Sequence, residues 1–162
     1  MNPIWMHTRS RTKGKAMTED FCVLPLPLPL HQLIQAWNTQ DAALLAACLH
    51  LDYESIQPHD PERNFWGRAA AVRNWQAVFD AVPNLQAELL RWAVGGNEVW
   101  TEWRWHGTYQ SGAAFRAGGV MVFGLSGAQI AWARVYTKIE QVIGPDWDAL
   151  IEEILNHEAA QN

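Results

Sequence analysis

The sequence predicts an α+β fold, in which helices come first and a curved antiparallel sheet follows. Apolar residues recur at helical spacing before Pro83, whereas long extended segments alternate with turn-forming pairs from Leu85 onward. Glycines also lie within or beside the long extended segments, where a sheet bends sharply: Gly112, Gly118, Gly119 and Gly124. A sheet bent around helices encloses a cone-shaped space, and such a space is a natural pocket.

Helical spacing and helix-ending residues define the first half of the chain. The first helix carries the apolar stripe Leu30, Leu33, Ile34 and Trp37. Asp41 can cap a second, short helix. A short strand is expected from about Tyr53 to Gln57, and a loop from Pro58 to Phe65 follows it. Gly67 opens a third helix, which Pro83 ends.

About four long strands are expected in the second half, joined by tight turns into a meander. The turns are the segments Gly95-Gly96-Asn97, Ser111-Gly112 and Ser126-Gly127. Gly144-Pro145-Asp146 then starts a last helix with the apolar stripe Trp147, Leu150, Ile151, Ile154 and Leu155. We therefore expect a flexible basic tail with a Leu-Pro segment over 1–29, one α+β domain over 30–140 and a C-terminal helix over 141–162.

Composition fits one globular domain and argues against two classes of partner. The 162 residues are 49% hydrophobic and 18% charged, with a net charge of -5. The first sixteen residues hold basic side chains and no acid, so the rest of the chain is strongly acidic. An acidic body is a poor nucleic-acid binder. A membrane span would need an apolar run of about 20 residues, and none is found.

Other motifs indicate a cytoplasmic protein without a metal or cofactor. Cys22 and Cys48 form no CxxC pair, so buried thiols in a reducing cytoplasm are the favoured interpretation. The six histidines are scattered, with no HxH or HxxxH spacing. There is no GxGxxG after a strand, no Walker loop and no GxSxG elbow. We expect no cofactor and no metal. Whether translation starts at Met1 or Met17 is open.

Short motifs occur along the chain in a recognisable order. They are Ala36-Trp37-Asn38-Thr39-Gln40-Asp41, Leu51-Asp52-Tyr53, Trp66-Gly67-Arg68-Ala69-Ala70, Phe79-Asp80-Ala81-Val82-Pro83-Asn84-Leu85, Gly107-Thr108, Gly119-Val120-Met121-Val122-Phe123 and Arg134-Val135-Tyr136. In this order and spacing the chain resembles the nuclear transport factor two-like superfamily, and more closely its SnoaL-like branch, which is related to polyketide cyclases and ketosteroid isomerase. The resemblance implies a cone-shaped α+β barrel over about residues 30 to 140. This fold hosts enzymes and plain binding proteins alike.

The resemblance also implies that the usual catalytic groups are missing. The places of the base, the tyrosine donor and the protonated acid of ketosteroid isomerase correspond to Gln57, Leu33 and Met121. The Asp-Arg-Asp set of limonene epoxide hydrolase corresponds to Trp103, Trp105 and Val135, and the acid of the polyketide cyclases lies near Val135. Each charged place has become uncharged, so enolate chemistry of that kind looks absent.

The predicted function is therefore binding of a small hydrophobic molecule, aromatic or polycyclic, in an uncharged aromatic pocket. The expected ligand-binding residues are Ser55, Gln57, Trp75, Phe79, Thr101, Trp103, Trp105, Met121 and Val135. Two alternatives stay open. The chain could be an isomerase, cyclase or hydrolase in which His59 or Tyr53 carries the proton. Tryptophans could instead fill the cone, which would leave a dimerisation module without a ligand.

The outer side of the sheet is expected to bind a second copy of the chain. Residues alternate between the two faces of a strand, so Trp103 and Trp105 share one face while Trp100 and Arg104 share the other. The resemblance implies that Trp103 and Trp105 point into the cone and that Trp100 and Arg104 point outward. Exposed tryptophans are costly in water, and they favour a protein contact. Proteins of the resembled superfamily often pair through this face. We expect Trp100, Arg104, Trp132 and Arg134 at a homodimer contact.

Overall fold

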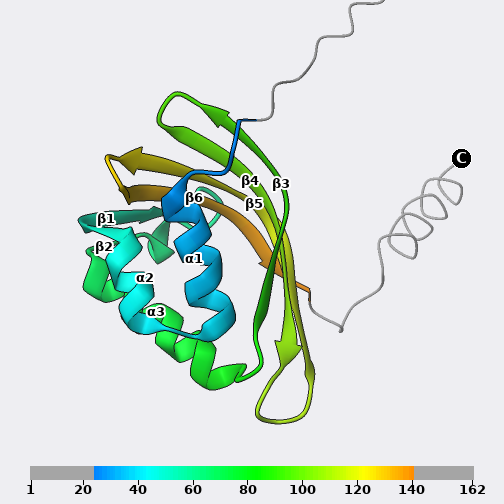
Figure 1. Cartoon of the computed structure of the whole chain (residues 1–162). Coiled ribbons are helices and arrows are strands. Elements are labelled where there is room, and N and C mark those ends of the chain that lie inside the picture. Colours follow the sequence, from blue (N-terminus) through cyan, green and yellow to red (C-terminus); the bar gives the residue numbers. More distant parts are fainter. Residues whose placement is uncertain (1–23, 141–162) are drawn as a thin grey trace, which may run out of the picture.

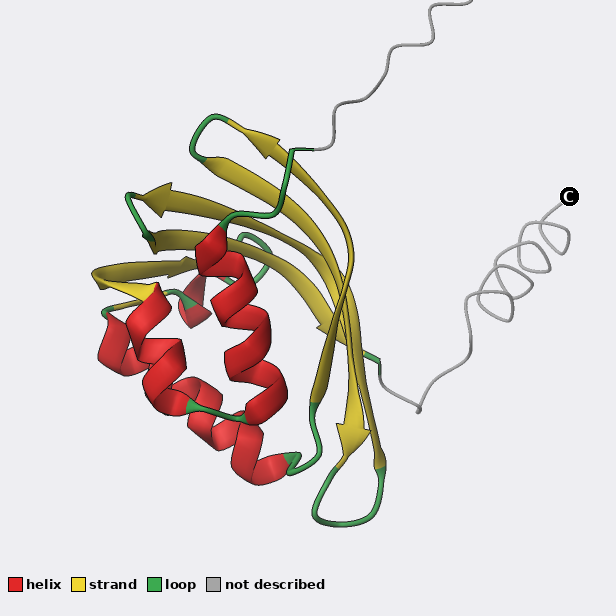
Figure 2. Ribbon diagram, viewed as in Figure 1, coloured by secondary structure: helices red, strands yellow, loops and turns green. Residues whose placement is uncertain are grey.

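A computed structural model describes residues 24–140, which form one layer of helices packed in the hollow of a curved sheet (Figure 1, Figure 2). Residues 1–23 of the tail expected over 1–29, and the C-terminal helix expected over 141–162, lie outside the described residues. The elements are α1 (Leu28–Thr39), α2 (Ala42–Cys48), β1 (Leu49–Ile56), a 3-10 turn (Pro61–Arg63), β2 (Phe65–Trp66), α3 (Arg68–Ala81), β3 (Gln86–Gly95), β4 (Glu98–Thr108), β5 (Ala114–Ser126) and β6 (Gln129–Ile139). Within the described residues, no helix is long and apolar enough to cross a membrane.

The sheet has the strand order β2-β1-β6-β5-β4-β3. The long strands β3 to β6 form the expected antiparallel meander. The first strand differs from expectation in two ways: β1 begins at Leu49 rather than near Tyr53, and it pairs in parallel with β6. The sheet is therefore mixed, because the chain crosses from β1 through α3 to the far edge before the meander starts. It is also unclosed, since β2 and β3 form its two edges.

The second and third helices begin where the sequence predicts, whereas α1 begins at Leu28, inside the Leu-Pro segment expected to belong to the tail. The Asp41 carboxylate accepts hydrogen bonds from the backbone N–H groups of Ala43 and Leu44, each at 2.9 Å, and so caps α2. Gly67 precedes α3 with φ of +90°, a conformation that favours glycine. At the start of the described chain, the Trp92 indole N–H donates to the carbonyl of Leu24 at 3.0 Å, which ties this segment to β3.

Glycine allows the sheet to curve over the helices. Gly119 in β5 has φ of +143°, and a Cβ there would collide with the backbone carbonyl of Tyr136 on β6. The register of β3 against β4 also shifts between Leu89 and Arg91. These irregularities bend the long strands around α1 and α3, as Figure 1 shows.

Side chains alternate strictly between the two faces of β4. Thr101, Trp103 and Trp105 are buried against the helices, whereas Trp100 and Arg104 are exposed on the outer face. The alternation in the sequence predicts the two opposite faces, and the inward placement of Trp103 and Trp105 is the one that the resemblance implies. The inner face and the helices together enclose one core, to which α1 contributes Leu30, Leu33, Ala36 and Trp37.

Candidate functional site

A cluster of four tryptophans occupies the interior of the cone. Trp37 on α1 stands at its centre, with ring centroids 4.6 Å from Trp75, 5.0 Å from Trp103 and 5.7 Å from Trp105. The indoles of Trp103 and Trp105 stack on each other at 5.6 Å, and Phe79 lies 6.0 Å from Trp75. Trp37 and Trp103 are each 1% exposed, so the deep part of the cone is packed with aromatic rings.

The buried hydroxyl of Thr101 holds one of these rings in place. It accepts a hydrogen bond from the indole N–H of Trp103 at 2.6 Å and donates to the backbone carbonyl of Met121 at 2.7 Å. Thr101 was expected to contact a ligand, but its donor and one acceptor position are used within the chain. The chain thus orients Trp103 from the neighbouring inward position of the same strand.

Two other indole N–H groups of the cluster have no acceptor within the described residues. They belong to Trp37 and Trp105, and both nitrogen atoms are buried. Trp37 meets Trp103 and Trp105 edge to face, and an N–H group directed at a ring gains less than one directed at an oxygen. A buried donor without an acceptor is unfavourable, so these two groups have hydrogen-bonding capacity left for a ligand.

The polar residues expected on β1 lie close to the interior, and most of their hydrogen-bonding groups are already bonded within the chain. Tyr53 and Ser55 are buried. Burial raises the pKa of the Tyr53 phenol far above its ordinary value of 10.0, and the hydrogen bond with Ser55 opposes this only in part. Gln57 is half-buried. Its side-chain N–H donates to the carbonyl of Arg63 at 3.1 Å, and its backbone N–H donates to the side-chain oxygen of Asn64 at 2.7 Å. Gln57 therefore fastens the loop after β1.

Inward-facing residues become half-exposed toward one end of the cone. On β6, Ala133 is fully buried, whereas Val135 and Thr137 farther along the strand are half-buried. Trp75 in the middle of α3 is half-buried as well, although it touches the buried Trp37. We use the name open end of the cone for this group of half-buried residues: Gln57, Phe65, Trp75, Val135 and Thr137.

The histidine proposed as a proton carrier lies away from this interior. The exposed ring of His59 is 5.7 Å from the ring of Tyr136, edge to face, and Tyr136 belongs to the outer face of β6. No group of three residues that could hold a metal ion occurs in the part of the chain that the structure describes.

Trp37 is the central residue that sequence reasoning assigned only to the core. Its place in the apolar stripe of the first helix did indicate burial, but not which rings it would meet. Trp75 and Phe79 lie one turn apart on α3, and Trp103 and Trp105 lie two positions apart on β4. This spacing predicts one aromatic face on α3 and another on β4. That both faces meet at Trp37 can be seen only in the folded structure.

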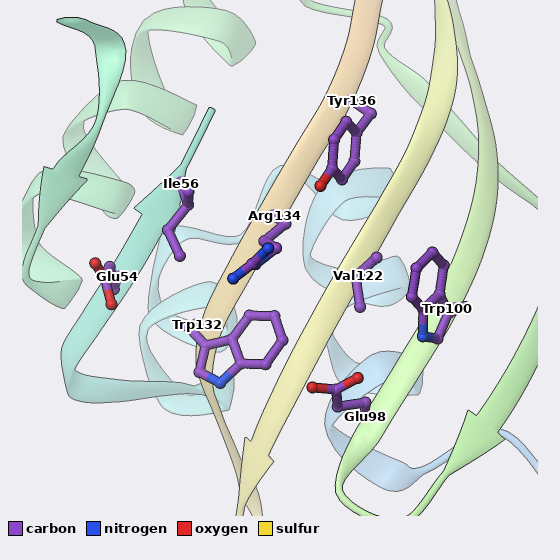
Figure 3. Close-up of a pocket in the computed structure, with 8 residues that line it drawn as sticks. All are labelled: Glu54, Ile56, Glu98, Trp100, Val122, Trp132, Arg134 and Tyr136. Carbon is purple, nitrogen blue, oxygen red and sulfur yellow. The ribbon is translucent and has the colours of Figure 1, made fainter. Parts of the chain in front are cut away.

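The outer face of the sheet carries a separate hollow of about 510 Å³. It is lined by Glu54, Ile56, Glu98, Trp100, Val122, Trp132, Arg134 and Tyr136. Figure 3 shows Arg134 in the middle, with Trp132 and Tyr136 on the same strand and Glu54 and Glu98 on strands to either side. We call this region the outer hollow.

A glycine shapes the outer hollow. A Cβ at Gly124 would overlap the indole ring of Trp132, so this ring lies directly over the glycine backbone. The guanidinium of Arg134 is 6.0 Å from the same ring, within cation–π distance. Beneath these side chains, Val122 is only 2% exposed although it points away from the cone.

Comparison with known families and structures agrees with this architecture. The model of the SnoaL-like domain family matches residues 30–133, which is more than half of the chain. Among curated protein sequences, none matches this chain.

Several solved structures share the fold at low sequence identity. AclR, a putative hydroxylase from Streptomyces galilaeus, is 14% identical with a TM-score of 0.66, over 82% of this chain and 91% of that one. An LEH-like epoxide hydrolase from M. tuberculosis is 14% identical with a TM-score of 0.58, again over 82% of this chain and 91% of that one. A putative SnoaL-like polyketide cyclase from Jannaschia sp. is 17% identical with a TM-score of 0.56, over 68% and 85%. At such identities the likeness concerns the fold alone.

Proposed function

The chain belongs to the SnoaL-like domain family, and from that premise we propose that it binds a small hydrophobic molecule at the open end of its cone. The proposed ligand is aromatic or polycyclic and carries a neutral hydrogen-bond acceptor such as a carbonyl oxygen. Structural relatives named as a polyketide cyclase and an epoxide hydrolase support a small organic molecule as the ligand class.

The observation that carries this proposal is the pair of buried indole N–H groups of Trp37 and Trp105, for which residues 24–140 supply no acceptor. A carbonyl oxygen has two lone pairs and can accept from both donors. A carboxylate would lose far more hydration energy, and the cluster offers it aromatic rings rather than a cation. A neutral acceptor is therefore the chemistry that suits this site.

Trp75 is the natural place for the ligand's ring. Its indole lies 4.6 Å from Trp37 at an interplanar angle of 37°, and it is half-buried at the open end. Because the deep rings are fully packed, a ligand enters by displacing Trp75 outward and stacking on Trp37 in its place. Val135, Met121 and Phe79 then form the apolar surroundings.

The proposal includes no proton carrier. A buried phenol whose pKa is raised, such as Tyr53, stays protonated at neutral pH and cannot act as a base. His59 is exposed beside the outer face. Neither of the two residues considered as an atypical acid or base is therefore used in the proposed function.

Two ligands that differ only at the acceptor test the proposal. We expect 9-fluorenone to quench tryptophan fluorescence saturably, and fluorene, which lacks the carbonyl, to bind about tenfold more weakly. The double variant Trp37→Phe and Trp105→Phe should remove this difference, because phenylalanine has no N–H. Trp66→Ala is the matched control, since Trp66 is 65% exposed on β2 and far from the cluster in the sheet order.

The outcomes separate the two parts of the proposal. If neither compound binds saturably to the parent chain, binding of such ligands at the cone is refuted. If both bind equally and the double variant changes nothing, the cone binds apolar rings but the acceptor role of the two indoles is wrong.

A further inference from the structure

The outer hollow differs from the rest of the outer face in its charges. Elsewhere on this face charged side chains are paired, as Arg104 is with Glu88 at 3.4 Å. In the outer hollow, by contrast, Arg134, Glu54 and Glu98 take part in no ion pair within residues 24–140. One basic and two acidic groups therefore surround an aromatic surface without satisfying one another.

The register of the strands places the three charges around Trp132. This residue pairs with Glu54 on one side and with Gly124 on the other, and Gly124 pairs in turn with Glu98. Neighbouring strands lie about 4.8 Å apart, so the backbones of the two acidic residues are about 14 Å apart. Figure 3 shows Trp132 between the two carboxylates and Arg134 beside it, at the next outward position of β6.

The ring of Trp132 offers a flat surface to a ligand. A Cβ at Gly124 would overlap this ring, so the indole fills the space over the glycine, and Figure 3 shows its broad side. The Arg134 guanidinium lies 6.0 Å from the centroid of the ring. Guanidinium groups stack on indole faces, so this surface suits a ligand that carries such a group.

From this pattern we infer that the outer hollow binds a cationic α-amino acid of the arginine type, at a site separate from the cone. The Arg134 guanidinium donates two parallel hydrogen bonds to the α-carboxylate of the ligand. The α-ammonium pairs with Glu54, and the side-chain guanidinium extends over Trp132 to Glu98. Because the α-carboxylate neutralises Arg134, a second guanidinium can approach the same ring. The ligand brings two positive groups and one negative group, so it matches the three unpaired charges one for one.

The dimensions of the outer hollow fit a ligand of this length. Its volume of about 510 Å³ lies within the range of small-molecule sites, roughly 300–1,000 Å³. Arg134 and Glu54 are one strand and one residue pair apart, about 8 Å at the backbone, so their side chains can reach the two adjacent charges of an α-amino acid. Glu98 lies two strands beyond Trp132, about 10 Å away, which an extended arginine side chain can bridge.

Ligands with fewer charges leave a group of the hollow unpaired. An anionic aromatic acid would satisfy Arg134 but would face Glu54 and Glu98. A simple organic amine would meet Arg134 at the centre of the hollow. An amino acid with a neutral side chain would pair at its α-carbon and leave Glu98 without a partner. The charge pattern therefore favours a dication that also carries a carboxylate.

Titration of the full chain with L-arginine, followed by the NMR signals of the indole N–H groups, tests the inference. The signals of Trp132 and Trp100 should shift saturably, and Trp132→Phe and Trp100→Phe assign them by removing one signal each. Three related compounds each lack one charged group. Agmatine lacks the α-carboxylate and should bind about tenfold more weakly, because it loses the two hydrogen bonds to the arginine of the site. L-citrulline and 5-guanidinopentanoate each lose an exposed ion pair and should bind about fivefold more weakly.

Single substitutions pair each ligand group with its side chain. Arg134→Gln should weaken L-arginine about tenfold and leave agmatine, which has no carboxylate, unweakened. Glu98→Gln should weaken L-arginine about fivefold and leave L-citrulline unchanged. Arg104→Gln is the matched control, since it removes the same charge from the same face, where Arg104 is paired with Glu88. Far-ultraviolet circular dichroism should be native for all three variants.

Three results would overturn the inference. The first is the absence of saturable shifts at Trp132 and Trp100 with L-arginine. The second is equal affinity of the parent chain for L-arginine, agmatine and L-citrulline, because the charges of the hollow would then not select the ligand. The third is a dimer in sedimentation velocity that Arg134→Gln dissociates and that binds no L-arginine, because a second copy of the chain would then fill the hollow.

Discussion

Replacing Thr101 by valine tests whether one hydroxyl organises the aromatic cluster. The substitution keeps the branched shape and removes the hydroxyl, which donates to Met121 at 2.7 Å and accepts from Trp103 at 2.6 Å. Thr101 is 2% exposed, so no solvent water replaces these bonds. Each hydrogen bond contributes about 1 kcal/mol, and an indole N–H left buried without an acceptor costs about 1–3 kcal/mol. We expect Thr101→Val to lower the free energy of unfolding by about 2–4 kcal/mol.

A double-mutant cycle separates the two bonds. In a Trp103→Phe background there is no indole N–H to leave unsatisfied, so Thr101→Val should cost only the bond to Met121, about 1 kcal/mol. Urea unfolding followed by far-ultraviolet circular dichroism measures all four proteins without relying on tryptophan fluorescence. If Thr101→Val cost less than about 0.5 kcal/mol, or if the two substitutions were additive, the hydroxyl would not be organising Trp103.

Three further predictions address the core and the sheet. Trp103→Ala should lower the free energy of unfolding by about 3–5 kcal/mol in urea titrations, because the ring is 1% exposed and touches three other aromatic rings. Gly119→Ala should destabilise the chain by more than about 1 kcal/mol in the same assay, since φ is +143° and the new Cβ would meet the Tyr136 carbonyl. Burial raises the pKa of the Cys48 thiol from 9.0 to about 11 and raises that of Tyr53, so the unfolded chain loses these protons first. The contribution of these two groups to the free energy of unfolding is therefore fully present below pH 9 and is lost as the pH rises toward 11. Across this pH range, the urea midpoint should fall less steeply in Cys48→Ala than in the parent chain.

Local patterns predicted the meander and its faces well. Thr101, Trp103 and Trp105 alternate with Glu102, Arg104 and His106, and this alternation separates the two faces of β4. Which of the two faces points inward followed from the resemblance to the SnoaL-like fold. The cap at Asp41 and the glycine before α3 were also predictable, because each acts within a few residues of itself.

The first strand was harder to predict because its partner is distant. Leu49-His50-Leu51-Asp52 begins directly after α2 with no turn residue between them. Its pairing with β6 depends on residues such as Ile130, far along the chain, which periodicity does not report. The same limit applies to the site. Spacing identified the aromatic rings of α3 and β4. Their contacts with Trp37 depend on packing between elements, and so does the hydrogen bond by which Thr101 supports Trp103.

The parallel pairing of β1 with β6 has a consequence for how the chain folds. Each hairpin of the meander joins neighbouring segments, so β3 to β6 can assemble early from local contacts. The cone is complete only when Glu54 reaches the register of Trp132, which closes a loop of about 80 residues and carries the entropy of that closure. Docking of β1 together with the helices is therefore expected to be the late step, and until it occurs the inner tryptophans are uncovered. A chain slowed at this step would expose apolar surface that favours aggregation.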